Sequence, residues 1–487
     1  MRRIWLARAL LLLSFVLPDA SALAQSPPRY DPDTILVRFK GSALPEEKAL
    51  AHALVGAHAH KHFTLVEGLQ AVRIPPGSHV KDALKFYRGH PAVLYAEPNW
   101  IVHTQAIPDD PRFGELWGLH NTGQNGGTSG ADIDAPGAWD LTTGSSDVVV
   151  AVIDTGIDYT HPDLAANMFH NTPDCDHDGI DDDGNGQIDD CFGIDTTNKD
   201  SDPMDDGDHG THVAGTIGAV GNNGVGVVGV NRTVRLMACK FLDSTGSGNI
   251  ADAIDCLEYV KLMKERGVNI VATNNSWGGS GFSQALFDAI EAHRQRGILF
   301  IAAAGNAGSD NDTTPSYPAG YSLSNVIAVA ATTRTDARAA FSSFGRHTVH
   351  LGAPGTEILS TTRGNTYQIF SGTSMATPHV TGVAALLKAQ DPERDWRAIK
   401  NLILAGGDTI SSLANTITGK RLNARGALSC SNAIVRSRVL PVANALTGSV
   451  GTPIDLGVLH INCANPNGPV SVTVDPGGLT MTFVPYS

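Results

Sequence analysis

Five near-continuous apolar segments constrain the fold of this 487-residue chain more than any other feature. They are DVVVAVI (147–153), RLMACKFL (235–242), NIVATNNS (269–276), GILFIAAA (297–304) and NVIAVAA (325–331). Strands that are apolar on both faces are typical of a parallel sheet covered by helices on both sides. Amphipathic segments at 250–266 and 283–296 separate strands, and a further helix is expected from Ser374 to about Ala389. We therefore predict an α/β fold with a doubly wound, mostly parallel sheet, whose functional site lies beyond the carboxyl ends of the strands.

Two regions that flank this sheet have different patterns. Before it, residues 33–103 have the order strand, helix, strand, helix, strand, at 35–39, 44–55, 69–75, 80–87 and 92–99. This order predicts a small α+β, ferredoxin-like domain. After about residue 425 helical periodicity is lost and Val, Thr, Gly and Pro are abundant, so we predict a β-rich segment at 429–487. It is shorter than the ~100 residues of a complete β-sandwich, and would be an appendage or an incomplete module.

Residues 1–24 have the pattern of a secretory signal peptide. Arginines precede the apolar run 9–17, and Ala22-Leu23-Ala24 forms a small-x-small cleavage site. The run is shorter than the ~20 apolar residues that a membrane span needs. We therefore expect a secreted protein, extracellular or periplasmic, without membrane association once the signal peptide is removed.

Six cysteines in an exported chain favour disulfide bonds. None forms a Cys-x-x-Cys pair, which argues against zinc and redox motifs. Fifteen connectivities are open to six cysteines, and we take the pairing of sequence neighbours as the hypothesis because each pair then encloses one local segment. The pairs are Cys175 with Cys191, Cys239 with Cys256, and Cys430 with Cys463. The alternative is that the cysteines are buried free thiols.

Acidic charge is concentrated in one stretch of the chain. The net charge is −14, and residues 174–208 hold fourteen aspartates and one lysine. An acidic chain is a poor binder of nucleic acid, so no nucleic-acid partner is expected. Oxygen-bearing side chains here alternate with turn residues, which is the pattern that a hard cation such as calcium requires. The candidate ligands are Asp174, Asp176, Asp178, Asp181, Asp183, Asn185 and Asp189.

The run DDDGNGQID resembles the start of an EF-hand loop but does not complete it. Asp181, Asp183 and Asn185 occupy the first, third and fifth positions, whereas the twelfth is Phe192 in place of the bidentate Glu. We predict a structural calcium loop that is not a true EF-hand, with neighbouring aspartates such as Asp190 as further ligands. The alternative is a solvated acidic hairpin, in which like charges at this density would repel.

Three motifs place chemically reactive side chains at a strand end and at two helix starts. DTGID puts Asp154 at the end of a buried strand, and HGTHVAGT puts His209 at the start of a helix. GTSMATPHV puts Ser374 at a helix N-terminus, with Pro378 in the first turn. A serine hydroxyl is a weak nucleophile that needs a base, and the base needs a carboxylate to orient it. Each residue alone could be an ordinary turn or cap residue, but together they supply a serine nucleophile, its base and the carboxylate that orients the base.

With AAAGN, which ends at Asn306, these motifs resemble those of the subtilisin family (subtilases) of serine peptidases. The chain order Asp, His, Ser is that of subtilisin. The resemblance covers about residues 108–425 and implies a subtilisin-like fold, with Ser374 as nucleophile, His209 as base and Asp154 as orienting carboxylate. It also implies that the Asn306 side chain and the Ser374 backbone N–H donate to the oxyanion of the tetrahedral intermediate.

The resemblance implies further binding roles. The segments NNSWGG and AAAGN would flank the pocket for the side chain before the scissile bond, and an extended peptide would add as a β-strand along 276–279. The expected substrate-binding residues are Ser276, Trp277, Gly278, Gly279, Ala303, Ala304 and Gly305. The family also suggests a second calcium site with Asp163 and Asn223. It implies an inhibitory propeptide at 25–105 and a peptidase domain at 106–428.

These features predict a secreted, calcium-stabilised serine endopeptidase that processes itself from a proenzyme. Its partners would be protein or peptide substrates and its own propeptide as inhibitor, and it would act as a monomer. The alternative from another class is a catalytically inactive, calcium-dependent binding protein on a peptidase scaffold. An esterase or lipase is disfavoured because the residues around Ser374 lack the G-x-S-x-G elbow and the chain order of the triad differs.

Overall fold

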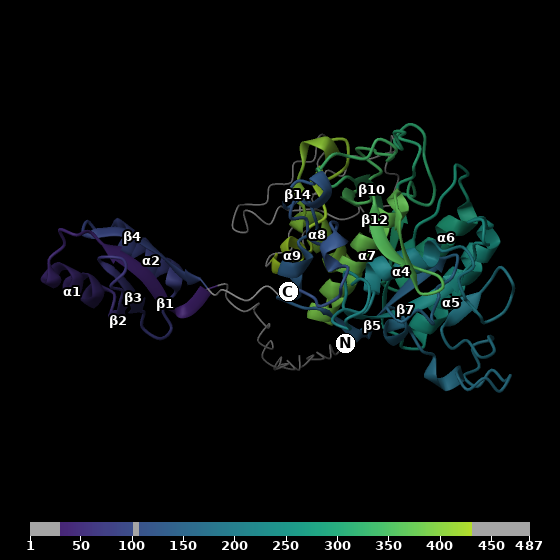
Figure 1. Ribbon diagram of the computed structural model, residues 1–487, viewed down its shortest axis with the longest axis horizontal. Coiled ribbons are helices and arrows are strands. Elements are labelled where there is room, and N and C mark those ends of the chain that lie inside the picture. Colours follow the sequence, from purple (N-terminus) through teal and green to yellow (C-terminus); the bar gives the residue numbers. More distant parts are fainter. Residues whose placement is uncertain (1–29, 101–106, 431–487) are drawn as a thin grey trace, which may run out of the picture. The chain divides into compact units, whose positions relative to one another are not determined.

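The computed structural model describes residues 30–100 and 107–430 (Figure 1). The predicted signal peptide, and the predicted β-rich segment beyond residue 430, lie outside the described residues. Contacts divide the chain at residue 103 into an N-terminal unit and a C-terminal unit. None of the helices in the described ranges has the length and apolar character needed to cross a membrane.

The N-terminal unit has the order β-α-β-β-α-β and a four-stranded sheet. Its elements are β1 (Tyr30–Phe39), α1 (Pro45–Leu54), β2 (His58–His62), β3 (Leu69–Arg73), α2 (Val80–Gly89) and β4 (Val93–Trp100). The sheet order is β2-β3-β1-β4 with antiparallel neighbours, as in the predicted ferredoxin-like domain. Strand β2 is absent from the prediction, because its sequence HAHKH is largely exposed and has no alternating apolar pattern.

A nine-stranded sheet forms the centre of the C-terminal unit. Its order is β14-β15-β11-β10-β9-β8-β5-β7-β6, and every neighbouring pair except β14 and β15 is parallel. The strands are β5 (Gly144–Asp154), β6 (Gly193–Asp195), β7 (Thr233–Lys240), β8 (Ile270–Asn275), β9 (Leu299–Ala303), β10 (Val326–Thr332), β11 (Leu351–Pro354), β14 (Asp408–Thr409) and β15 (Lys420–Arg421). The five apolar segments correspond to β5, β7, β8, β9 and β10, which confirms the predicted sheet. The other four strands are too short to show a periodic pattern.

Helices cover both faces of this sheet. They are α3 (Ala135–Trp139), α4 (His209–Gly218), α5 (Ile250–Glu265), α6 (Gln284–Gln295), α7 (Thr373–Gln390), α8 (Trp396–Gly406) and α9 (Ala424–Ser429). Alternate residues of β5 face two separate cores. Val150 and Val152 pack with α4 and α7, whereas Ala151 and Ile153 pack with α5 and α6. This two-sided packing is the doubly wound arrangement that the sequence predicts.

A hairpin leads into helix α7, the helix that carries Ser374. Its strands are β12 (Ile358–Thr362) and β13 (Thr366–Phe370). The sequence predicts Pro378 in the first turn of the helix, and this is wrong. The helix begins at Thr373, so that Pro378 is its sixth residue and lies in the second turn. Short 3-10 turns elsewhere comprise Phe113–Glu115, Gln124–Gly126, Ala165–Asn167, Thr172–Asp174 and Ser411–Leu413.

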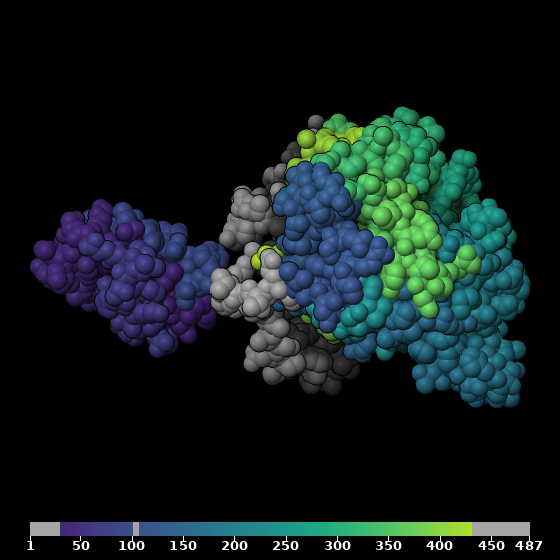
Figure 2. Space-filling view, in the orientation of Figure 1, coloured from purple at the N-terminus to yellow at the C-terminus, as the bar shows by residue number. Residues whose placement is uncertain are grey.

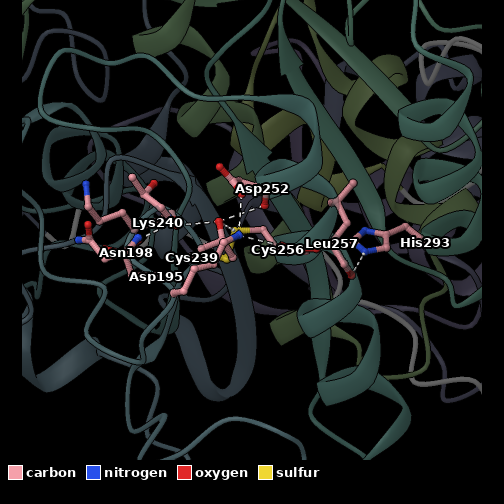
Figure 3. Close-up of a disulfide and its surroundings, with 12 residues drawn as sticks. Asp195, Asn198, Cys239, Lys240, Asp252, Cys256, Leu257 and His293 are labelled. Carbon is pink, nitrogen blue, oxygen red and sulfur yellow. Dashed lines mark hydrogen bonds and ion pairs between the residues drawn. A yellow bond between two sulfur atoms is a disulfide. The ribbon is translucent and has the colours of Figure 1, made fainter.

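The described cysteines are all disulfide-bonded. Two bonds pair sequence neighbours as predicted, Cys175–Cys191 and Cys239–Cys256. The first encloses the acidic loop, and the second joins β7 to α5 (Figure 3). Cys430 is also disulfide-bonded, and its predicted partner Cys463 lies outside the described residues. The alternative of free thiols is therefore excluded for the described cysteines.

Candidate active site

Asp154 and His209 form a hydrogen-bonded pair at the carboxyl edge of the sheet. Asp154 is the last residue of β5 and is fully buried, and His209 is the first residue of α4. The His209 Nδ1–H donates to Asp154 Oδ1 at 2.7 Å, and the backbone N–H of Thr155 donates to the same oxygen at 2.8 Å. Burial disfavours charge on the imidazole, but the carboxylates of Asp154 and Asp205 together outweigh burial and raise the pKa of His209. The pair is thus suited to accept a proton and hold it.

A second buried carboxylate, Asp205, fixes the segments that follow both members of this pair. Its Oδ1 accepts from the Thr155 hydroxyl at 2.8 Å, and its Oδ2 accepts from the backbone N–H of Thr211 at 2.9 Å and from the Thr211 hydroxyl at 2.5 Å. The Thr155 hydroxyl in turn accepts from the backbone N–H of Gly210 at 2.9 Å. No motif in the sequence distinguishes Asp205 from the other aspartates of its acidic stretch.

Ser374 is tied to the end of β8, the strand beside β5. Its hydroxyl donates to the backbone carbonyl of Ser276 at 3.0 Å, and the Ser276 hydroxyl donates to the Ser374 carbonyl at 2.8 Å. Because β5 and β8 are neighbouring parallel strands, their carboxyl ends bring Ser374 to the same edge of the sheet as Asp154. Helices α4 and α7 also pack against each other there.

Asn306 follows β9, the next strand in the sheet. Its side-chain oxygen accepts from the backbone N–H and from the hydroxyl of Thr373, both at 2.9 Å. A Cβ placed on Gly372 would lie 3.5 Å from both Asn306 Nδ2 and the Ser374 backbone nitrogen. The Ser374 N–H is in the first turn of α7 and has no acceptor within that helix. Both nitrogens therefore lie close to Gly372, the residue that precedes helix α7.

A cavity of about 320 Å³ opens beside Ser374 and Asn306. Six of the seven predicted substrate-binding residues line it, namely Ser276, Trp277, Gly278, Gly279, Ala303 and Gly305. Its other wall, Thr314 to Ser316, has no counterpart among the predicted residues. Gly279 and Tyr317 join the two walls through backbone hydrogen bonds of 2.7 and 2.8 Å. None of the described residues that line the cavity carries a charged side chain.

Ala304, the seventh predicted residue, does not line this cavity. It is fully buried and packs with Ala330 and Val349, since successive residues of an extended segment point to opposite sides. A larger cavity of about 640 Å³ lies between the acidic loop and helices α5 and α6. It contains none of the four predicted catalytic residues, so the smaller cavity is the candidate site on chemical grounds.

The acidic loop arranges its predicted calcium ligands in two clusters, and Figure 2 shows the loop projecting from the C-terminal unit (blue-teal). Within each cluster, one carboxylate oxygen of every member lies within 4.8 Å of the others. The first cluster is Asp174, Asp181 and Asp183, and the second is Asp176, Asp178 and Asp189. Asn185 lies beside the first cluster, and its Nδ2 donates to Asp183 at 3.2 Å.

Asp190, expected as a further ligand, makes hydrogen bonds at the base of the loop. It accepts from the Tyr259 hydroxyl at 2.5 Å and from Asn171 Nδ2 at 2.6 Å. Burial raises the pKa of Asp190 to about 6. It is a member of neither cluster, and it joins the base of the loop to α5.

Asp163 and Asn223, the pair that the resemblance suggests for a second calcium site, contact each other. Asn223 Nδ2 donates to Asp163 Oδ1 at 2.8 Å. A further acid, Asp110, lies nearby and is absent from the predicted set. Its Oδ2 accepts from the backbone N–H of Asn222 at 2.9 Å, and its buried Oδ1 has no hydrogen-bond partner among the described residues. Burial raises the pKa of both Asp110 and Asp163. No spacing motif marks Asp110 in the sequence.

Two family descriptions and several known proteins are similar to this chain. The subtilase family matches residues 145–416, and the fervidolysin N-terminal prodomain matches residues 18–99. A thermophilic serine proteinase of Bacillus sp. (strain AK1) is 35% identical over 81% of this chain and 86% of its own length. Thermitase of Thermoactinomyces vulgaris is 36% identical over 59% of this chain and 88% of its own length.

A solved structure agrees with these sequence relatives. A cold adapted subtilisin-like serine proteinase is 29% identical and superposes with a TM-score of 0.50, covering 66% of this chain and 99% of its own. The predicted family, fold class and enzyme class are thereby confirmed. The chain belongs to the subtilase family of serine peptidases and carries an N-terminal prodomain of the fervidolysin type.

Proposed function

We propose that this subtilase is a calcium-stabilised serine endopeptidase that is exported and processes itself from a proenzyme. The observation that supports the proposal most directly is the hydrogen-bonded Asp154–His209 pair at the carboxyl end of β5, beside the strand β8 to whose end Ser374 is hydrogen-bonded. These are the groups that acyl transfer to a serine requires.

Each group has a definite part in the reaction. The Ser374 hydroxyl attacks the peptide carbonyl while His209 accepts its proton, and Asp154 stabilises the imidazolium that forms. The Asn306 amide and the Ser374 N–H donate to the oxyanion. His209 then gives its proton to the leaving amine, and water hydrolyses the acyl-enzyme by the same steps.

The cavity supports a broad preference for uncharged side chains. An extended peptide would pair with residues 276–279 through main-chain hydrogen bonds, which tolerate many sequences. The residue before the scissile bond would enter the cavity beside Ser374. A charged side chain would lose its hydration there without gaining a counter-charge, and this is costly.

The acidic clusters fit calcium. Each contains three carboxylates and one buried oxygen, Asp174 Oδ2 or Asp189 Oδ1, without a hydrogen-bond partner among the described residues. Asp163, Asn223 and Asp110 would form another site, where Asp110 Oδ1 is buried in the same way. Bound calcium would supply the positive charge that offsets repulsion between the carboxylates.

The prodomain would keep the peptidase inactive until it has been exported. A signal peptide at 1–24 would direct export, and residues 25–105 would inhibit the peptidase domain at 106–428 until they are removed. Parallel sheets fold slowly, so a folding template has a physical role. The mature enzyme would act as a monomer. N-terminal sequencing of secreted protein that found Tyr30 or an earlier residue as the stable start would contradict this scheme.

Comparison of wild type with Ser374→Ala on a peptide library, with intact mass measured in parallel, tests the function. Wild type should cleave peptides and shed its prodomain, whereas folded Ser374→Ala should do neither. Asn306→Ala should lose ~10²–10³ in kcat, the range found when an oxyanion donor is removed in subtilisin, a relative. Failure of a fluorophosphonate to label Ser374 in the mature wild type would favour the inactive binding protein.

A further inference from the structure

Helix α7 carries a proline where its missing N–H affects the proposed nucleophile. In a regular helix, the N–H of residue 378 donates to the carbonyl of residue 374. Pro378 has no N–H, and its ring crowds that carbonyl. The Ser374 carbonyl therefore loses its helical partner at a half-buried position, where an unpaired carbonyl is costly.

Ser276, the residue that follows strand β8, supplies the missing donor. Its hydroxyl lies 2.8 Å from the Ser374 carbonyl, and only 5% of Ser276 is exposed. Asn274 Nδ2 donates to the Ser276 hydroxyl at 3.0 Å, and the Thr381 hydroxyl donates to Asn274 Oδ1 at 2.9 Å. Because the Ser276 oxygen already accepts from Asn274, its proton is directed to the Ser374 carbonyl.

Ser276 also contacts the hydroxyl of Ser374. The Ser374 hydroxyl donates to the Ser276 backbone carbonyl at 3.0 Å, so that Ser374 is attached to the end of β8 at two points. We propose that Ser276 is a positioning residue, whose side chain orients Ser374 by making the hydrogen bond that Pro378 removes from α7. This inference rests on the proposed function, in which Ser374 is the nucleophile.

Ser276→Ala removes the hydroxyl and keeps the backbone carbonyl on which the strand pairing of a peptide depends. We expect kcat to fall about tenfold with KM within about twofold, because only the placement of Ser374 changes. Labelling of Ser374 by a small sulfonyl fluoride, which does not use the peptide-binding edge, should slow by the same factor. Unchanged labelling together with slower peptide hydrolysis would show that Ser276 acts on the substrate and would overturn the inference.

Ser342→Ala is the matched control for the loss of a buried hydroxyl. Ser342 is fully buried, accepts from the backbone N–H of Ala331 at 2.8 Å and donates to the Ser343 carbonyl at 3.1 Å. This variant should lower the melting temperature without changing the labelling rate. An equal loss of labelling in Ser342→Ala would mean that any buried hydroxyl has this effect, and would overturn the specific role of Ser276.

Pro378→Ala provides an independent test. The substituted alanine restores the helical N–H, so the Ser374 carbonyl regains a partner without Ser276. The labelling cost of Ser276→Ala should shrink from about tenfold to less than about threefold in this background. An equal cost in both backgrounds would overturn the inference. If the wild type itself is neither labelled nor able to cleave peptides, the proposed function fails instead, so the two failures are distinguishable.

Discussion

The close approach at Gly210 makes Gly210→Ala an informative perturbation of the active site. A Cβ at this position would lie 2.0 Å from the Gly156 carbonyl oxygen and 3.2 Å from Asp154 Cβ. Real Cβ atoms essentially never approach another heavy atom to under 3.0 Å. Helix α4 and the turn after β5 must therefore separate by about 1 Å, because neither backbone atom can rotate away in a close-packed interior. The His209–Asp154 hydrogen bond spans this same interface.

A misplacement of about 1 Å can reduce catalysis ~10²-fold. We therefore expect kcat/KM of Gly210→Ala to fall about 100-fold, which corresponds to about 2.7 kcal/mol of transition-state stabilisation. The acid limb of its pH profile should move to lower pH, because a more distant Asp154 raises the pKa of His209 less. Steady-state kinetics on a peptide that the wild type cleaves, with thermal melts, measure both effects. Gly114→Ala is the control, since its Cβ would meet nothing within 4 Å. A Gly210→Ala enzyme with kcat/KM within threefold of wild type would refute the reasoning.

Three further predictions concern pH and metal. Asp205→Asn should lower the pKa of His209, because the Asp205 charge favours the imidazolium. The acid limb of the kcat/KM profile should therefore move to lower pH. If the acid limb does not move, Asp205 has a structural role only. Burial lowers the pKa of His293 and of His379 to about 4 and that of His212 to about 3. Below about pH 6.5 the unfolded chain therefore binds more protons than the folded chain. The free energy of unfolding should fall by about 1.4 kcal/mol per pH unit for each histidine as the pH drops toward 4. Urea titrations whose midpoint does not change over this pH range would contradict the prediction. A calcium chelator should lower the melting temperature. If calcium was present at 100 times its Kd, its removal should lower the free energy of unfolding by about 3 kcal/mol. Added calcium, but not magnesium, should restore the melting temperature.

Local patterns were enough to predict the sheet and to select candidate catalytic side chains. Apolar segments of strand length that alternate with amphipathic helices have few solutions other than a two-sided parallel sheet, so β5, β7, β8, β9 and β10 were recognisable. Residues at strand ends and helix starts, such as Asp154, His209 and Ser374, must then lie at one edge. The same patterns do not reveal β2, whose HAHKH sequence owes its extended form to pairing with β3.

Partners that are distant in the sequence could not be predicted in this way. Asp205 and Asp110 carry the same side chain as their exposed neighbours, and only the fold buries them. Ala304 belongs to a recognisable motif, yet its direction out of the cavity depends on packing with Ala330 and Val349.

The sequence by itself determined the five long strands of the large sheet, their parallel direction and the chemical groups available at the carboxyl edge, because periodicity and motif spacing are local properties. The tertiary structure alone decided which of those groups meet. Ser276 and Ser374 are 98 residues apart, and the hydrogen bonds between them exist because β8 and the start of α7 are packed side by side. The absence of an N–H at Pro378 follows from the sequence alone. The Ser276 hydroxyl that donates to the Ser374 carbonyl in its place is brought there by the fold.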